Sequence, residues 1–476
     1  MLFRYLSFAP ALLATVQAET ILGVTVFTRH GDRTSKHYKG YNLTNLGIQQ
    51  NYNVGADYRD LYISANSSKQ ILGISENKAV NSQLFASAPD QAVLLNTATA
   101  FLQGLYPPLQ SLDSGLAVQS LNNGDEVTAP LEGYQYLVLH SENDDSPDTI
   151  WLKGDEECPV LTTSMKNYKN SEAIKQKSEE TKSFYQGFWD DLKNVYDMKE
   201  SNMTYENAYT IFDLINVGII HNTSMKDAVT PEQLTQLRTL ADAYEFGLSY
   251  DQNDKARSIG AQAFAGGILA QLKSIVSSQG KLKFSLLAGS YDTFQGFFGL
   301  ANLTSVSPDF FGLPDYASTM SFEIFTAQNV SAFPSNTEDL RVRFLFRNGS
   351  TAGEEPRAFP LFNGKEESLS YSEFVGKMED IAITKPEQWC STCGSDLLFC
   401  EAYAKQGQSP VSTENHQGGG MSNAVAGVIG AMVTLGVVAL VSAAAFFVLR
   451  KRRVNAHFAQ SEQMRQKSTG SDGVSV

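Results

Sequence analysis

The stretch that decides the fold reads ILGVTVF at residues 21–27 and continues as TRHGDRTS at residues 28–35. Its first part is an uncharged run of apolar and β-branched residues, which is typical of a strand buried on both faces. In open α/β sheets, ligands bind beyond the carboxyl ends of the strands. The sequence therefore predicts a buried strand whose following loop holds a functional site.

Two arginines flank a histidine in this loop, in the order Arg29, His30 and Arg33. Guanidinium groups hold oxyanions through charge-assisted hydrogen bonds, and a neutral imidazole between them can attack phosphorus. Gly31 lets the backbone turn sharply and approach an anion closely. The pattern predicts that Arg29 and Arg33 bind phosphate and that His30 is a nucleophile. In the alternative interpretation, both arginines pair with surface acids and His30 has no catalytic role.

Three further segments share a pattern with this loop: LTNLGIQ at residues 43–49, FLQGLYPP at 101–108 and KFSLLAGSYDT at 283–293. Together with the RHG-x-R pentad, they resemble the histidine acid phosphatase family, in the branch of fungal acid phosphatases and phytases. The resemblance runs from about residue 21 to residue 400. It implies an α/β fold, in which a core sheet flanked by helices carries a mostly helical cap inserted at about residues 109–275.

The resemblance also implies roles for individual residues. His30 would form a phosphohistidine, Arg29 and Arg33 would bind the phosphate, and Asp292 would protonate the leaving group. Asp292 has a second interpretation, because DTFQ at residues 292–295 is also a helix cap with a capping box.

Two family phosphate ligands are missing from this sequence. The histidine that precedes the aspartate is replaced by Tyr291, and the slot of a third arginine falls on Ser87 within a stretch, residues 81–104, that has no basic residue. Where such a donor stabilises transition-state charge, its loss costs about 10²–10³ in rate. The hydroxyls of Tyr291 and Ser87 can still donate, so both are candidate substitutes. Ser35 replaces the family proline after Arg33.

Two functions follow from these residues. The first is a slow or specialised phosphatase that hydrolyses a phosphorylated small molecule, with an acidic optimum if Asp292 must be protonated. Its scheme needs neither a metal nor an organic cofactor, and the sequence shows no metal-ligand cluster. The second is a catalytically degenerate phosphatase fold that binds an anion, a glycan or a protein at a surface.

The middle of the chain carries helical patterns that support a cap independently of the resemblance. Apolar residues recur at helical spacing within residues 182–198, and TPEQ at residues 230–233 has the features of a helix start. We expect two helices of the cap there.

The composition excludes several classes of protein. The chain has 476 residues, is 42% hydrophobic and 18% charged, and carries a formal net charge of −14. These values are typical of a globular protein. An acidic body without basic runs argues against nucleic-acid binding.

The two ends predict a single-pass membrane protein with an outside or luminal ectodomain at residues 19–400, at the cell surface or in a vacuole. Residues 1–18 have the features of a secretory signal peptide, with a buried N-terminal helix as the alternative. Residues 401–423 are a predicted flexible stalk. Residues 424–449 form an uncharged run long enough to span a bilayer, and the tail at 450–476 opens with four basic residues. Small residues in this run are compatible with dimerisation, which stays open.

Because the chain is predicted to enter the secretory pathway, we expect it to carry disulfides and glycans. Four cysteines can form two disulfides in one of three pairings, with redox or zinc chemistry of the C-x-x-C pair as the alternative: Cys158, Cys390, Cys393 and Cys400. Seven sequons precede the predicted span: Asn42, Asn66, Asn202, Asn222, Asn302, Asn329 and Asn348.

Overall fold

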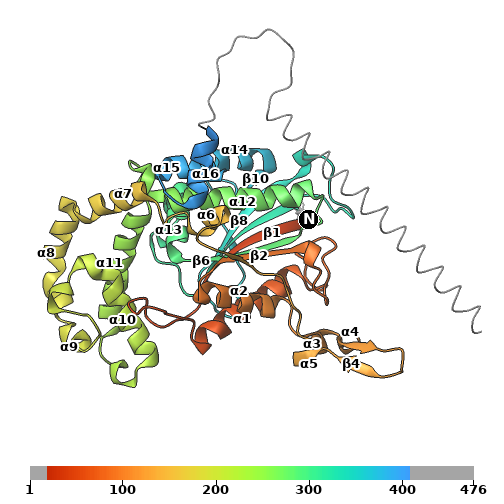
Figure 1. Cartoon of the computed structure of the whole chain (residues 1–476), viewed down its shortest axis with the longest axis horizontal. Helices are drawn as coiled ribbons and strands as arrows, with labels where there is room; N and C mark the ends of the chain where they lie inside the picture. Colours follow the sequence, from red (N-terminus) through yellow and green to blue (C-terminus); the bar gives the residue numbers. More distant parts are fainter. Residues whose placement is uncertain (1–18, 408–476) are drawn as a thin grey trace, which may run out of the picture. The chain divides into compact units, whose positions relative to one another are not determined.

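The computed structural model describes residues 19–407, which form a mixed α/β fold around one large sheet (Figure 1). The predicted signal peptide, the membrane span, the basic tail and residues 408–423 of the predicted stalk lie outside the described residues. The stalk was expected to begin at residue 401, but helix α16 (Leu398–Gly407) continues past that point.

The large sheet has the strand order β10-β8-β7-β1-β6-β2-β5, with β9 paired to β8. A separate hairpin is formed by β3 and β4. The bounds of the strands are β1 Thr20–Arg29, β2 Leu84–Pro89, β3 Val118–Ser120, β4 Glu126–Thr128, β5 His140–Glu142, β6 Phe284–Gly289, β7 Thr319–Thr326, β8 Arg341–Arg347, β9 Arg357–Ala358 and β10 Ser368–Ser370.

The central strand β1 is buried along nearly its whole length, as the apolar run predicts. It pairs in parallel with β6, with Arg29 opposite Gly289, and antiparallel with β7. Because parallel strands end at the same edge of a sheet, the loop after β1 and the start of the helix after β6 lie together. This edge is where the functional site is expected.

Helices cover both faces of the sheet. On one face, α12 (Ile259–Ser277) and α13 (Tyr291–Leu300) pack on apolar side chains that include Phe27. On the other face, α1 (Asn45–Tyr62) and α2 (Ala92–Leu105) pack on side chains that include Val24 and Val26. The remaining helices are α3 Leu109–Leu112, α4 Ser114–Ala117, α5 Pro130–Gly133, α6 Ile150–Lys153, α7 Pro159–Lys169, α8 Glu172–Gln186, α9 Trp189–Leu192, α10 Ala208–His221, α11 Pro231–Ser249, α14 Tyr371–Ile381 and α15 Pro386–Cys393.

A third apolar cluster joins α8 to α11 and forms a helical cap beside the sheet (Figure 1). The predicted insert at 109–275 is wider than this cap, because β5 joins the main sheet and α12 packs on it. The expected start of α11 is confirmed, since Thr230 and Gln233 form a capping box. The expected helix over 182–198 is confirmed only in part: α8 ends at Gln186 with Gly187 as its C-cap, and the short helix α9 covers Trp189–Leu192.

Among the described residues, one helix, Lys255–Ser277, is long and apolar enough to cross a membrane. It includes α12, whose apolar side chains pack in the core against the sheet, and 67% of its apolar window is buried. It is therefore a core helix. The predicted span at 424–449 is a different segment and remains a prediction.

The structure has two disulfides: Cys158–Cys393 joins the end of the described chain to the segment before α7, and Cys390–Cys400 closes a short loop within that end. The structure thus selects one of the three possible pairings, and the C-x-x-C cysteines bond to other partners rather than to each other. Of the seven sequon asparagines, five are exposed and two, Asn202 and Asn302, are half-buried.

We expect the Cys158–Cys393 disulfide to contribute more stability than Cys390–Cys400. The two bonds close loops with sequence separations of 235 and 10, and a longer loop loses more conformational entropy in the unfolded chain. A double Cys158→Ala, Cys393→Ala variant should lose about 2–5 kcal/mol of unfolding free energy in a denaturant titration. The Cys390→Ala, Cys400→Ala variant is the matched control, and a larger loss there would contradict the expectation.

Candidate active site

The loop after β1 lies directly on the first turn of α1. The hydroxyl of Thr44 caps this helix by accepting from the Gly47 N–H. A Cβ atom on Gly31 would lie 2.3 Å from the carbonyl oxygen of Gly47, and one on Gly47 would lie 1.9 Å from that of Asp32. Glycine is therefore required at both positions by the contact between loop and helix, which is a different reason from the anion approach predicted for Gly31.

Asn51 of α1 holds the backbone on both sides of His30. Its Oδ1 accepts a hydrogen bond from the Gly31 N–H (2.7 Å), and its Nδ2 donates to the Arg29 carbonyl (3.1 Å). The side chain is fully buried. Sequence reasoning missed this positioning residue because an asparagine within a helix carries no motif of its own.

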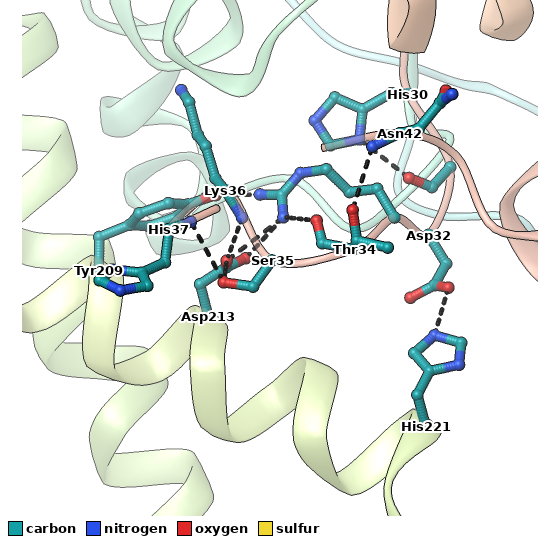
Figure 2. Close-up of polar contacts among 12 residues, drawn as sticks. His30, Asp32, Thr34, Ser35, Lys36, His37, Asn42, Tyr209, Asp213 and His221 are labelled. Atoms are coloured by element: carbon teal, nitrogen blue, oxygen red, sulfur yellow. Dashed lines mark hydrogen bonds and ion pairs between the residues drawn. The ribbon is translucent and has the colours of Figure 1, made fainter. Parts of the chain in front are cut away.

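Asp32 links the same loop to α1 and to the cap. Its buried carboxylate contacts the Thr44 hydroxyl, which donates to it, and Nε2 of His221 lies 2.7 Å from Oδ2 (Figure 2). His221 is the last residue of α10. The sequence offered no motif around His221 that predicts this contact.

His30 is buried and held as a neutral imidazole. Its Nδ1 lies 2.9 Å from the carbonyl oxygen of Gly31, and because a carbonyl only accepts, Nδ1 carries the proton. Burial, followed by the positive charges of Arg29 and Arg33, lowers the pKa of His30 well below 6.5. The ring therefore keeps an unprotonated Nε2, which is the form that a nucleophile needs.

Arg29 is buried between two aromatic rings. Its guanidinium carbon lies 5.3 Å from the ring centre of Tyr291 and 4.8 Å from that of Tyr316, within the range of cation–π attraction. One terminal nitrogen donates to the carbonyl of Pro314, and Nε has no hydrogen-bond partner. Burial lowers the pKa of Arg29 below its ordinary value.

Arg33 is fully buried and paired with a carboxylate from the cap. Its Nη1 lies 3.0 Å from Oδ1 of Asp213 on α10, and its Nη2 donates to the Tyr209 hydroxyl at 2.8 Å. Burial alone would lower the pKa of Arg33, but Tyr209 and Asp213 outweigh this effect and raise it. Arg33 thus already has a negative partner within the protein.

A cavity of about 400 Å³ opens beside Arg29, between the sheet edge and the cap. Its charged lining residues are two arginines and two aspartates: Arg29, Arg238, Asp213 and Asp315. Arg238 pairs with Asp315 at 3.1 Å and with Asp242 at 2.8 Å. Within residues 19–407, no group of three or more His, Cys, Asp or Glu side chains could hold a metal ion.

The chain matches the model of a known protein family. The model of the histidine phosphatase superfamily (branch 2) matches residues 37–347, which is well over half of the chain. The chain belongs to this superfamily. The recognised resemblance to histidine acid phosphatases is therefore confirmed, and family membership supports phosphoric monoester hydrolase activity in general terms.

Solved structures similar to this histidine phosphatase include phytases. The apo phytase of Hafnia alvei is 12% identical, with 79% of this chain and 98% of that chain covered and a TM-score of 0.49. The phytase of D. castellii is 12% identical, with 84% and 87% covered and a TM-score of 0.48. The multiple inositol polyphosphate phosphatase of Bifidobacterium longum is 14% identical, with 80% and 96% covered and a TM-score of 0.45. No curated protein sequence matches.

Tyr291, which replaces the expected family histidine, lies in the site of this histidine phosphatase as the first residue of α13. Its ring faces Arg29, but its hydroxyl donates to Oε2 of Glu245 at 2.8 Å. Burial raises the pKa of Glu245 to about 7. The predicted substitute donor is therefore beside the arginine, with its proton committed to a carboxyl group of the cap.

Asp292 faces a different and smaller cavity, which it lines together with Asp155. Burial, followed by the negative charge of the nearby Asp292, raises the pKa of Asp155 well above its ordinary value, and a hydrogen bond with Asp292 adds to the rise. The expected helix cap is wrong: Ser290 is at the N-cap of α13 and makes no side-chain cap bond. Asp292 is not among the residues that line the cavity at Arg29.

Ser87, the second candidate substitute, lies in β2 and lines a third cavity with His140 and Trp151. Its hydroxyl donates to Oε1 of Glu142 at 3.0 Å. Six residues were predicted from the sequence to form the site. The structure brings four of them together: Arg29, His30, Arg33 and Tyr291. The other two, Asp292 and Ser87, line cavities other than the one at Arg29.

The raised pKa of Glu245 predicts that stability falls as the pH rises. The folded protein retains a proton that the unfolded chain loses above pH 4.5, so the unfolding free energy should decrease between about pH 4.5 and pH 7. The contribution of this group is about 2–3 kcal/mol.

A Glu245→Gln variant, which keeps an acceptor for Tyr291, should lose that part of the pH dependence in denaturant titrations at pH 5 and pH 8. Glu179→Gln, at an exposed position of α8, is the control and should follow the wild type. An unchanged pH profile in the Glu245 variant would count against this assignment.

Proposed function

We propose that this protein is a slow phosphomonoesterase that forms a phosphohistidine on His30, within an ectodomain anchored to a membrane by one helix. The observation that carries the proposal is the neutral, buried His30 with its proton on Nδ1, held between Arg29 and Arg33. Arg29 adjoins a cavity large enough for a phosphorylated small molecule.

In the proposed reaction, Arg29 holds the phosphoryl group and Nε2 of His30 attacks the phosphorus atom. The P–N bond forms as the P–O bond to the leaving group breaks, and the departing oxygen takes up a proton. Water then attacks the phosphohistidine, which releases inorganic phosphate and restores the imidazole. No cofactor is needed for these steps.

The proton donor is the weak part of this site. Asp292 lines a small cavity with Asp155 and, like His30 and Arg33, is not among the residues that line the cavity at Arg29. Without a positioned acid, general-acid catalysis, which contributes about 10²–10⁴ in rate, is reduced. Together with the missing third arginine and the Tyr291 replacement, this supports a slow enzyme that favours good leaving groups.

Membrane anchoring and passage through the secretory pathway are part of the proposal. They are supported by the signal-like N-terminus, the uncharged run at 424–449 followed by basic residues, and the disulfide pairs. The ligand is a phosphorylated small molecule or another anion, and nothing in the acidic composition suggests nucleic acid.

A His30→Ala variant should abolish phosphatase activity. The assay uses an aryl phosphate and inositol hexakisphosphate between about pH 3 and pH 7, with wild type and variant purified in the same way. The expected result is measurable aryl phosphate hydrolysis in the wild type and a loss of at least 10²-fold in the variant, because the nucleophile is gone. Equal activity in both proteins would rule out catalysis by this site.

The role of Asp292 can be tested through the leaving group. If Asp292 does not act as the acid, Asp292→Asn should change the rates for aryl and alkyl phosphates by similar factors. A loss that is at least tenfold greater for the alkyl phosphate would show that Asp292 reaches the leaving oxygen in the working enzyme.

The second candidate is a non-catalytic binding protein, and the ion pair between Arg33 and Asp213 favours it. Half of the arginine pair that should hold phosphate is neutralised within the fold. In that case, the assay above shows no His30-dependent turnover, and the cavity at Arg29 serves to hold an anionic ligand.

A further inference from the structure

The carboxylate of Asp213 sits in a set of donors that belongs to the loop after β1. Its Oδ2 accepts from the Ser35 hydroxyl (2.7 Å) and the Lys36 N–H (2.9 Å), and both of its oxygens contact Nη1 of Arg33 (Figure 2). We call these three groups of Arg33, Ser35 and Lys36 the anion nest. The Asp213 side chain occupies this nest and is only 5% exposed.

A guanidinium, a hydroxyl and a backbone N–H that converge on one point form a general oxyanion site. In this structure the oxyanion at that point is the carboxylate of Asp213, which belongs to α10 of the cap. A phosphate that approached Arg33 would meet a carboxylate at hydrogen-bond distance from the same donors, and like charges that close repel strongly when they are buried.

Arg29 is in the opposite condition. Among the residues that the structure describes, it forms no ion pair, it donates to a backbone carbonyl, and its Nε is buried without a partner. Of the two arginines, Arg29 therefore carries the positive charge that is free to attract an anion, while that of Arg33 is compensated by Asp213.

We propose that Asp213 is a tethered competitor for phosphate: it occupies the Arg33 half of the catalytic anion site, and a phosphoryl group must displace it to contact both arginines. Asp213 is thereby a specificity-determining residue. It selects against ligands with several phosphate groups, because Asp213 also lines the cavity at Arg29 together with Asp315, and two carboxylates there face Arg29 and Arg238. This inference rests on the proposed function in one respect, namely that the same loop binds phosphate.

The decisive measurement is the affinity for inorganic phosphate. Asp213→Asn keeps the shape and an acceptor oxygen but removes the negative charge, so Arg33 becomes available. The full-length protein in detergent should bind inorganic phosphate at least tenfold more tightly by calorimetry when it carries Asp213→Asn. Unchanged or weaker binding would overturn the proposal, because a purely structural ion pair predicts no gain.

The chain offers a closely matched control in Asp254. This residue contacts Arg257 (3.6 Å), the Ser164 hydroxyl and the Ala256 N–H, which are the same three kinds of donor, away from the loop after β1. Asp254→Asn also removes one negative charge, at a position after α11 and outside the cap, and should change phosphate affinity by less than threefold. A comparable gain in this control would mean that the effect is one of net charge, and would also overturn the proposal.

Thermal melting with and without phosphate distinguishes an Asp213→Asn variant that fails to fold from one that folds but gains no phosphate affinity. The variant leaves Arg33 buried without a counter-charge, so it should be less stable, and phosphate should raise its melting temperature more than that of the wild type. In the double variant Arg33→Gln, Asp213→Asn the extra shift should disappear. If it persists, the phosphate does not act through Arg33 and the proposal fails.

These outcomes are independent of turnover. If His30→Ala keeps full activity but Asp213→Asn gains phosphate affinity, the proposed catalysis fails and the tethered competitor stands. If His30→Ala is inactive and Asp213→Asn shows no gain, the catalytic proposal stands and Asp213 is only a link between cap and core.

Discussion

The guanidinium groups of Arg29 and Arg33 are both buried at the end of β1, and the rest of the site must compensate for their charge. A buried cation is tolerated only when neighbouring groups compensate for the water it has lost. Arg33 obtains a carboxylate from α10 and a hydroxyl from Tyr209, whereas Arg29 obtains two aromatic faces and a carbonyl. The cap is therefore joined to the sheet through charge compensation as well as through apolar packing.

The same two charges prepare the histidine between them. Positive neighbours and burial favour a neutral imidazole, and the carbonyl of Gly31 selects the tautomer. The clamp of Asn51 on both flanking peptide groups keeps this geometry. The nucleophile is thus organised by short-range contacts within the loop and α1, which do not depend on the groups that the chain has lost.

The side chains that the family resemblance assigns to the phosphate and to the leaving oxygen are instead engaged by residues that lie far away in the chain. Tyr291 turns its hydroxyl to Glu245, Asp292 pairs with Asp155, and Asp213 enters the nest of Arg33. All three contacts engage acidic side chains from segments that precede β6 in the chain. The proposed nucleophile is therefore held in place, whereas residues proposed to act on phosphate are engaged by acidic side chains. The same contacts fit both a slow enzyme and an anion-binding protein. Ser35, which stands in the place of the family proline, supplies one of the donors that hold Asp213 in place.

The sequence by itself determined the buried strand β1, the position of His30 and the two arginines at its end, the helix start at Thr230, and membership of the phosphatase family, because these depend on local pattern and short spacing. From the resemblance, it also predicted that Ser87 and Tyr291 replace a family arginine and a family histidine. Only the tertiary structure decided which cavity each side chain faces, how the four cysteines pair, and that Asp213 lies on Arg33. Those facts depend on which residues far apart in the chain meet when the cap packs on the sheet. No local pattern records the contact between residues 33 and 213, because it forms through burial of one charge against another across 180 positions.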